Sequence, residues 1–203
     1  MDFKKILINV LSSLIIVLRR SILLIITPYK TMRQIAQEKD FYQIIIFAGL
    51  IFGYFIWATK IKDFLLPSYL MFVLAIVNCT ILISFFYLLF KYFDKSLKLN
   101  SFIFTLSYSL IPTLIWFFSN SIFYFILPPP RTTSILGKGF SIFFIAFSIS
   151  LLIWKLILVY LALRFSSKQS FYRIIFFMLL FFCFFLPYSL LLYQFKIFRI
   201  PFV

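Results

Sequence analysis

Hydrophobic residues form long runs along this chain, and short connections with most of the charged residues separate the runs. A helix rises about 1.5 Å per residue and the hydrocarbon core of a bilayer is about 30 Å thick, so about 20 apolar residues are needed to cross it. Five runs meet that length, and each predicts a transmembrane helix. The predicted spans cover residues 41–59, 66–90, 102–127, 140–163 and 174–195.

The length of these runs also decides between helix and strand. β-branched and aromatic residues are abundant in them and would favour strands in a soluble protein. Strands of a membrane barrel, however, alternate apolar and polar residues and are about half as long. In lipid, a helix satisfies its backbone hydrogen bonds within its own segment. The pattern therefore predicts an all-α, polytopic membrane protein with five transmembrane helices.

The segment before the first predicted span has a different pattern. At about 100° per residue, its polar side chains fall within an arc of about 120°, and apolar side chains fill most of the rest. Such a helix lies in the membrane interface, with Lys and Arg toward the lipid headgroups. We therefore expect an N-terminal interfacial amphipathic helix, followed at Thr27 and Pro28 by the N-cap and first position of a short second helix. The polar stripe consists of Lys5, Asn9, Ser12, Ser13, Arg19 and Arg20.

A sixth span over residues 6–26 is the alternative for this segment. It would place Arg19 and Arg20 in hydrocarbon, at about 2.5–3.5 kcal/mol each near the helix centre. Their position toward one end of the helix would lower that cost, because long basic side chains extend to the interface. The remaining cost favours the interfacial helix.

The chain thus divides into three parts. Residues 1–40 form a cytoplasmic or interfacial amphipathic region, residues 41–195 form the helical membrane domain, and residues 196–203 form a short C-terminal tail.

The net charge of +15 comes from twenty basic and five acidic residues. The basic residues are spread over short connections, which argues against nucleic acid as a partner and favours anionic membrane lipids. Thirteen lie in the N-terminal region and the second and fourth connections, against six on the opposite side, so the positive-inside rule places the N-terminus in the cytoplasm and the C-terminus outside. The candidate contacts with lipid headgroups are Lys4, Lys5, Arg19, Arg20, Lys30 and Arg33.

Small residues and prolines within the spans predict how the helices pack and bend. Gly49 and Gly53 form a G-x-x-x-G pair in the first span, which favours close helix packing within the chain, with a homodimer seam as the alternative. Pro112 in the third span and Pro187 in the fifth each remove a backbone donor, so we expect both helices to kink.

The residue types needed for most enzymatic chemistry are scarce. The chain has no histidine, and its two cysteines lie in different predicted spans, where small core residues are the expected role. We therefore expect no enzyme, no cofactor, no catalytic residues and no metal site. The five carboxylates all lie outside the spans or at their edges: Asp2, Glu38, Asp40, Asp63 and Asp94.

One charged residue lies deep within a predicted span. Lys155 precedes Arg164 by nine residues, which puts it about 13 Å from the inner end of the fourth span. A lysine at that depth is costly unless it extends to the interface, is neutral, or meets a polar partner. We expect Lys155 to face the bundle interior, with Asn78 of the second span as the best candidate partner.

Several short motifs occur in a recognisable order over roughly residues 27–180. They are Thr27-Pro28 with Ile35-Ala36-Gln37-Glu38 before the first span, Tyr108-Ser109-Leu110-Ile111-Pro112 in the third, and then Trp154, Leu163-Arg164-Phe165-Ser166 and Ser170. In these motifs the chain resembles the Yip family of five-span, Ypt/Rab-interacting membrane proteins, and its prokaryotic branch most closely.

This resemblance implies a five-helix bundle with a cytosolic N-terminus, here in a prokaryotic plasma membrane. Eukaryotic members have an Asp-Leu-Tyr-Gly-Pro motif before the first span. This chain has Asp40-Phe41-Tyr42-Gln43 at a similar place, without the Gly-Pro, which argues against a Rab-type GTPase as partner.

Three functions fit the sequence. The leading hypothesis is a non-enzymatic protein that organises the bilayer or scaffolds other membrane proteins, including copies of itself, with its N-terminal helix on the cytoplasmic leaflet. The second is a transporter of small solutes or lipids that uses a polar path near Asn78 and Lys155. The third is a hydrophobic subunit of a larger membrane complex.

Overall fold

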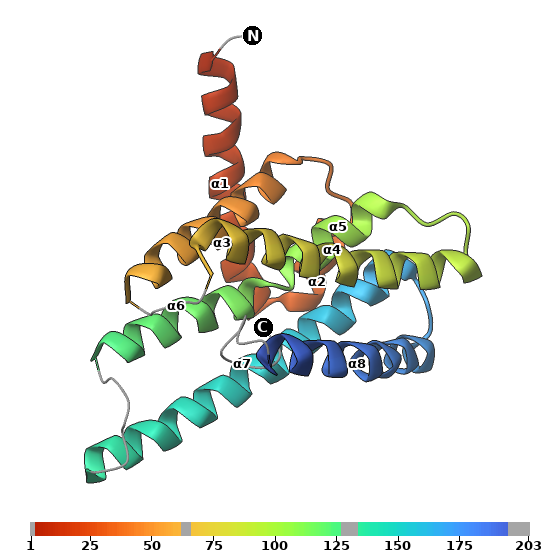
Figure 1. The fold of residues 1–203 in the computed structure, drawn as a ribbon. Helices are drawn as coiled ribbons and strands as arrows, with labels where there is room; N and C mark the ends of the chain where they lie inside the picture. Colours follow the sequence, from red (N-terminus) through yellow and green to blue (C-terminus); the bar gives the residue numbers. More distant parts are fainter. Residues whose placement is uncertain (1–2, 62–65, 127–133, 195–203) are drawn as a thin grey trace.

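The computed structural model describes residues 3–61, 66–126 and 134–194, with side chains described from Leu7 onward. All regular secondary structure in these ranges is α-helical (Figure 1). The predicted C-terminal tail lies outside the described residues. The helices are α1 (Phe3–Ile26), α2 (Pro28–Ile35), α3 (Tyr42–Ile61), α4 (Ser68–Phe93), α5 (Leu99–Tyr108), α6 (Ile111–Ile126), α7 (Ile135–Ser167) and α8 (Phe171–Gln194).

Six segments of the described chain are long and apolar enough to cross a membrane. The protein is therefore an all-α, multi-pass integral membrane protein, as the sequence predicted. The five predicted spans correspond to α3, α4, the pair α5 and α6, α7 and α8. The sixth segment, Leu7–Ile26, belongs to α1, so the number of candidate spans is one more than the five expected.

The third span is interrupted rather than simply kinked. Pro112 is the second residue of α6, and Ser109 and Leu110 separate α5 from α6. Because proline has no N–H, the Tyr108 carbonyl has no donor four residues further on, and the helix stops and restarts. In the fifth span, by contrast, α8 continues through Pro187.

The helix α1 runs in a different direction from the other long helices. Figure 1 shows α3, α4, α6, α7 and α8 as a bundle of alternating direction, with α1 crossing it and its N-terminal half extending beyond it. Within the bundle, α1 packs on α2 and α3. Its inward stripe contains Ser13, Val17 and Leu24, each at most 2% exposed, at the spacing of one helix face. The outward stripe is apolar and consists of Leu7, Leu11, Ile15, Leu18, Ile22 and Ile25.

The short helix α2 follows α1 with a single residue between them. Pro28 is its first residue and Thr27 occupies the N-cap position, as expected. The Thr27 hydroxyl does not cap α2, however, and instead donates to the Leu23 carbonyl oxygen at 3.3 Å. The result is a sharp reversal that brings α2 against α5 and α7.

The most buried part of the molecule lies where α5 meets the C-terminal half of α7. Phe102 and Leu163 are fully buried there. Between the two helices, the hydroxyls of Thr105 and Ser166 are 2.7 Å apart and share a hydrogen bond. The helix α7 is the longest, and its N-terminal end extends past the neighbouring helices (Figure 1).

The G-x-x-x-G pair does not pack helices together within the described chain. Gly49 and Gly53 are both exposed, and a β-carbon placed on either would have no other atom within 4 Å. The expectation of close intramolecular packing at these glycines is therefore wrong, because α3 turns this face away from its neighbours. A homodimer seam at this face stays a prediction.

Candidate functional site

A cavity of about 410 Å³ lies inside the bundle, with walls from α3, α4, α7, α8 and the region where α5 gives way to α6. Its volume falls within the range of about 300–1,000 Å³ that is typical of ligand sites. The wall is mostly Leu, Ile, Val, Phe and Met side chains. The other residues in the wall include one cysteine, Cys79, and four polar residues, Asn78, Ser109, Thr113 and Lys155.

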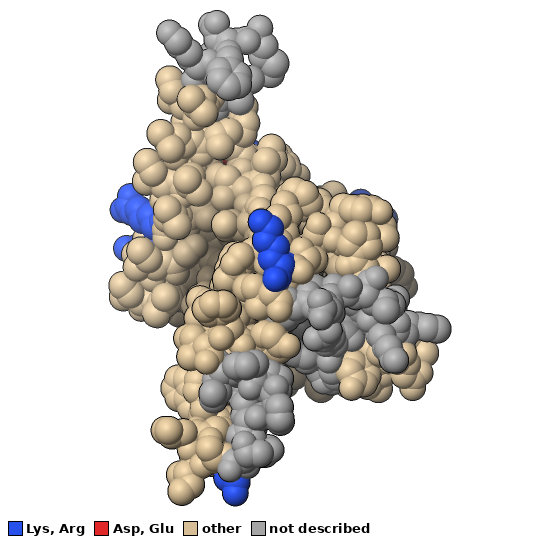
Figure 2. Space-filling model, turned by 60° about the vertical axis from the view of Figure 1, so that its left-hand side comes forward, with Lys and Arg blue, Asp and Glu red and all other residues tan. Residues whose placement is uncertain are grey.

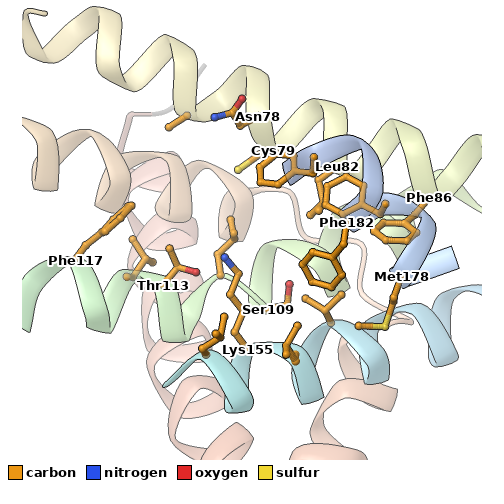
Figure 3. Close-up of a pocket in the computed structure, with 18 of the residues that line it drawn as sticks. Asn78, Cys79, Leu82, Phe86, Ser109, Thr113, Phe117, Lys155, Met178 and Phe182 are labelled. Atoms are coloured by element: carbon orange, nitrogen blue, oxygen red, sulfur yellow. The ribbon is translucent and has the colours of Figure 1, made fainter. Parts of the chain in front are cut away.

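Among the described residues of this wall, Lys155 has the one charged side chain. It extends from α7 into the cavity, toward the side where Ser109 and Thr113 lie (Figure 3). This is the interior orientation that the sequence predicted. Among the described residues, the Lys155 ammonium has no hydrogen bond and no ion pair. A cation in a mostly apolar cavity therefore lacks the counter-charge that usually accompanies it.

Asn78 lines the same cavity but does not bind Lys155, so the expected pairing is wrong. The Asn78 side-chain oxygen instead accepts a hydrogen bond of 2.8 Å from the Tyr188 hydroxyl of α8. This bond joins α4 to α8 and satisfies the amide oxygen within the protein. The polar path predicted near Asn78 and Lys155 is thus one cavity with two polar groups that do not contact each other.

The break before Pro112 brings two hydroxyl groups to the cavity wall. The Ser109 hydroxyl donates to the Leu106 carbonyl oxygen at 2.7 Å and so is already satisfied. The buried Thr113 hydroxyl oxygen has no hydrogen-bond partner within the described structure. Neither residue was predicted from the sequence as part of a site, although the expected distortion at Pro112 was a signal that backbone and hydroxyl groups could be presented here.

A second polar cluster anchors α1 to the connection between α2 and α3. Arg20 forms an ion pair with Glu38 and also donates to the Gln43 side-chain oxygen at 3.0 Å. The same oxygen accepts a bond of 2.7 Å from the Tyr108 hydroxyl, so the cluster reaches the end of α5. Ser13 adds a hydrogen bond to the Asp40 carboxylate.

The ionisation of Glu38 reflects this environment. Partial burial raises the pKa of its carboxyl group, but the Lys39 backbone N–H and the Arg20 guanidinium together outweigh that effect and hold the pKa below its ordinary value of 4.5. The charged form of Glu38 is therefore the one that the folded protein stabilises.

The predicted headgroup contacts divide into three groups. Arg19, Lys30 and Arg33 are exposed and free to meet lipid headgroups. Arg20 instead faces the protein, so its predicted role is wrong, because Glu38 and Gln43 supply partners on that side. The remaining two, Lys4 and Lys5, have side chains outside the described part of the chain.

Exposed basic side chains do not form a dense patch on the face shown in Figure 2. There, isolated Lys and Arg side chains are separated by broad surface of other residue types.

Cys79 lines the cavity whereas Cys183 is exposed on α8, so the expected core position does not hold for Cys183. The part of the chain that the structure describes holds no cluster of metal-ligating side chains.

Comparisons of the chain with protein families, with curated proteins and with solved structures find no match. The resemblance to the Yip family therefore stays a prediction.

Proposed function

We propose that this protein is a non-enzymatic integral membrane protein that binds an anionic amphiphile, taken from the surrounding bilayer, in the Lys155 cavity. One observation carries the proposal, namely the Lys155 ammonium, which has no ion pair within the described part of the chain and lies in a mostly apolar cavity among the membrane helices. Handling of a lipid or lipid-like molecule is the function that this combination supports best.

The physical argument concerns the cost of the charge. An unpaired charge in a medium of low dielectric constant is strongly disfavoured, and an ion pair with good hydrogen bonds offsets much of that cost. A ligand that carries a negative group would provide the pair to Lys155. The apolar wall would then hold the ligand's hydrocarbon part.

The test is to purify the full-length protein from its membrane in a non-ionic detergent and to quantify the retained anionic lipids by mass spectrometry. The key variant is Lys155→Met, which keeps the length of the side chain and removes its charge. Lys138→Met is the matched control, because Lys138 is an exposed lysine on the same helix. We expect the retained anionic amphiphile to be lost in Lys155→Met only. Equal retention in all three proteins would refute the proposal.

A second candidate function, organisation of the bilayer by α1, is favoured by a separate observation. The helix crosses the direction of the bundle and exposes a continuous apolar stripe (Figure 1). In this proposal α1 lies in the cytoplasmic leaflet of a prokaryotic plasma membrane, with five spans behind it. Arg19 then lies at headgroup level, where one basic residue contributes about 1 kcal/mol of attraction to anionic lipid.

The positions of the two termini test this second candidate. With five spans and an interfacial α1, tags at the N- and C-terminus lie on opposite sides of the membrane, the N-terminal one in the cytoplasm. With α1 as a sixth span, the two tags lie on the same side. Protease accessibility of both tags in intact and in opened cells measures the difference, and termini on the same side would exclude the interfacial position.

A further inference from the structure

The charge of the cavity restricts the ligand's headgroup. Lys155 supplies one positive charge, and the described residues that line the cavity include no acidic group. A monoanion therefore balances the site. A phosphate monoester carries a charge of about −1.5 to −2 at neutral pH and would leave negative charge uncompensated in an apolar surrounding. Carboxylates and phosphodiesters remain as headgroups.

The volume of the cavity restricts the hydrocarbon part. A water molecule occupies about 30 Å³ in the liquid and a methylene group is of similar size, so about 410 Å³ holds about fourteen such groups. This is enough for a carboxylate on one chain of about twelve carbon atoms. The two chains and glycerol of a phosphodiester lipid have several times as many heavy atoms, so most of such a lipid would lie outside the cavity.

The unpartnered hydroxyl of Thr113 fits a carboxylate. A carboxylate has two oxygens, and each accepts hydrogen bonds in the plane of the group. One oxygen would pair with the Lys155 ammonium and the other would accept from the Thr113 hydroxyl, which lies buried without a partner among the described residues. A carboxylic acid also crosses hydrocarbon in its neutral, protonated form, whereas a phosphodiester stays charged.

We infer that the ligand is a single-chain monocarboxylate, a fatty acid of about twelve carbon atoms, with its carboxylate at Lys155 and Thr113 and its chain along the Phe and Met side chains of α8. This inference rests on the proposed function and names the ligand class for the same cavity. The α8 side chains that line the cavity are Met178, Phe181, Phe182, Phe185 and Leu186.

Binding is measured by native mass spectrometry and calorimetry on the purified full-length protein in non-ionic detergent. The probes are dodecanoate, the neutral alcohol dodecanol and the two-chain lipid phosphatidylglycerol. We expect one dodecanoate per protein, with an affinity about tenfold or more lower in Lys155→Met and unchanged in Lys138→Met. Thr113→Val removes one hydrogen bond to the ligand and should weaken binding about fivefold. Binding of dodecanol should not depend on Lys155.

Chain length provides a readout that a merely structural role of Lys155 would not affect. In a series of saturated fatty acids, affinity should peak near twelve carbons and fall for longer chains. Ala75 lines the cavity, so Ala75→Phe should shift the peak toward shorter acids without removing the charge. This variant also keeps the inference testable if Lys155→Met fails to fold.

The outcomes separate this inference from the proposed function. Binding of phosphatidylglycerol that depends on Lys155, without such binding of dodecanoate, would overturn the inference and leave the function standing. If no anionic probe binds in a way that depends on Lys155, both the inference and the proposed function are overturned. Fatty-acid binding with no preferred chain length would overturn a single-chain site of limited volume.

Discussion

At the scale of single residues, several polar side chains within the bundle bind a partner on another helix. Trp116 donates to Ser148 at 3.0 Å across α6 and α7, and Tyr188 donates to Asn78 across α8 and α4. Each such bond between helices in a membrane contributes on average about 0.6 kcal/mol. Among the described residues of the cavity wall, Lys155 and the Thr113 hydroxyl have no such partner, and together they mark the site.

The Asn78–Tyr188 bond leads to a first prediction. Tyr188→Phe removes the donor and should lower the free energy of unfolding by about 0.6 kcal/mol, and by about 1.7 kcal/mol at most. Thermal unfolding in detergent measures this, with Tyr193→Phe as the control on an exposed position of the same helix. Binding of the anionic ligand should be unchanged, because Lys155 does not use this bond. Loss of ligand binding in Tyr188→Phe would contradict the conclusion that the Asn78–Tyr188 bond and the Lys155 ammonium act independently.

The exposed glycines give a second prediction. Gly53→Ala adds a methyl group that meets no other atom within 4 Å, and alanine is the better helix former by about 1 kcal/mol. We expect a small rise in the unfolding temperature and unchanged self-association in lipid vesicles, measured by fluorescence transfer between labelled copies. If self-association falls instead, this face is a contact between copies of the chain.

The orientation of Lys155 was predictable from sequence, whereas its partner was not. A charge near the middle of a span must turn inward, whatever the details of packing. Which polar group it then meets depends on the rotation of each helix about its axis. The apolar runs around Asn78 leave that rotation undetermined, since they are hydrophobic on every side.

At the scale of the helices, span positions follow from bilayer thickness and were therefore predictable to within a few residues. The break between α5 and α6 was not, because a proline within a span is compatible with either a kink or a stop. The inward face of α1 was also missed. Its polar stripe predicted headgroup contacts, but Glu38 and Asp40, from the connection beyond α2, provide the partners of Arg20 and Ser13.

The anchoring of α1 gives a third prediction, on pH. The pKa of Glu38 is lower in the folded protein than its ordinary value of 4.5, so the ion pair with Arg20 stabilises the fold above that pH and the stabilisation is lost as the pH falls through the lowered pKa. In Glu38→Gln this part of the acid sensitivity should disappear, with lower stability at pH 7. Thermal unfolding from pH 7 to pH 3 measures both.

A control is needed because another carboxyl group has a lowered pKa. Hydrogen bonds from the Ser96 hydroxyl and backbone N–H lower the pKa of the exposed Asp94. Asp94→Asn should leave the acid sensitivity that depends on Glu38 in place. If Glu38→Gln has the same pH profile as the unmodified protein, the ion pair does not anchor α1.

At the scale of the whole molecule, the cavity is where five spans meet. Side chains from α3, α4, α7 and α8, together with those around the break in the third span, form one wall. A ligand there contacts every predicted span at once. Its binding should therefore affect the stability of the entire bundle rather than that of one helix.

This gives a fourth prediction. Dodecanoate at a free concentration of 100 times its dissociation constant should stabilise the folded protein by about 2.7 kcal/mol. Thermal unfolding with and without the ligand measures the shift, at a constant detergent concentration. The shift should be absent in Lys155→Met and present in Lys138→Met. An equal shift in both variants would mean that the fatty acid acts through the detergent micelle.

The helix α7 has 33 residues and is about 50 Å long, about 20 Å more than the hydrocarbon core of an average bilayer. Its first residues include the exposed Lys138 as well as the exposed apolar Ile135 and Leu136, so the predominantly apolar part, residues 139–163, is about 37 Å long and still exceeds that thickness. Such hydrophobic mismatch is relieved by a strong tilt of the helix or by local thickening of the lipid around it, at a fraction of a kcal/mol for each ångström. Among membranes of different thickness, this protein will therefore partition toward the thicker ones.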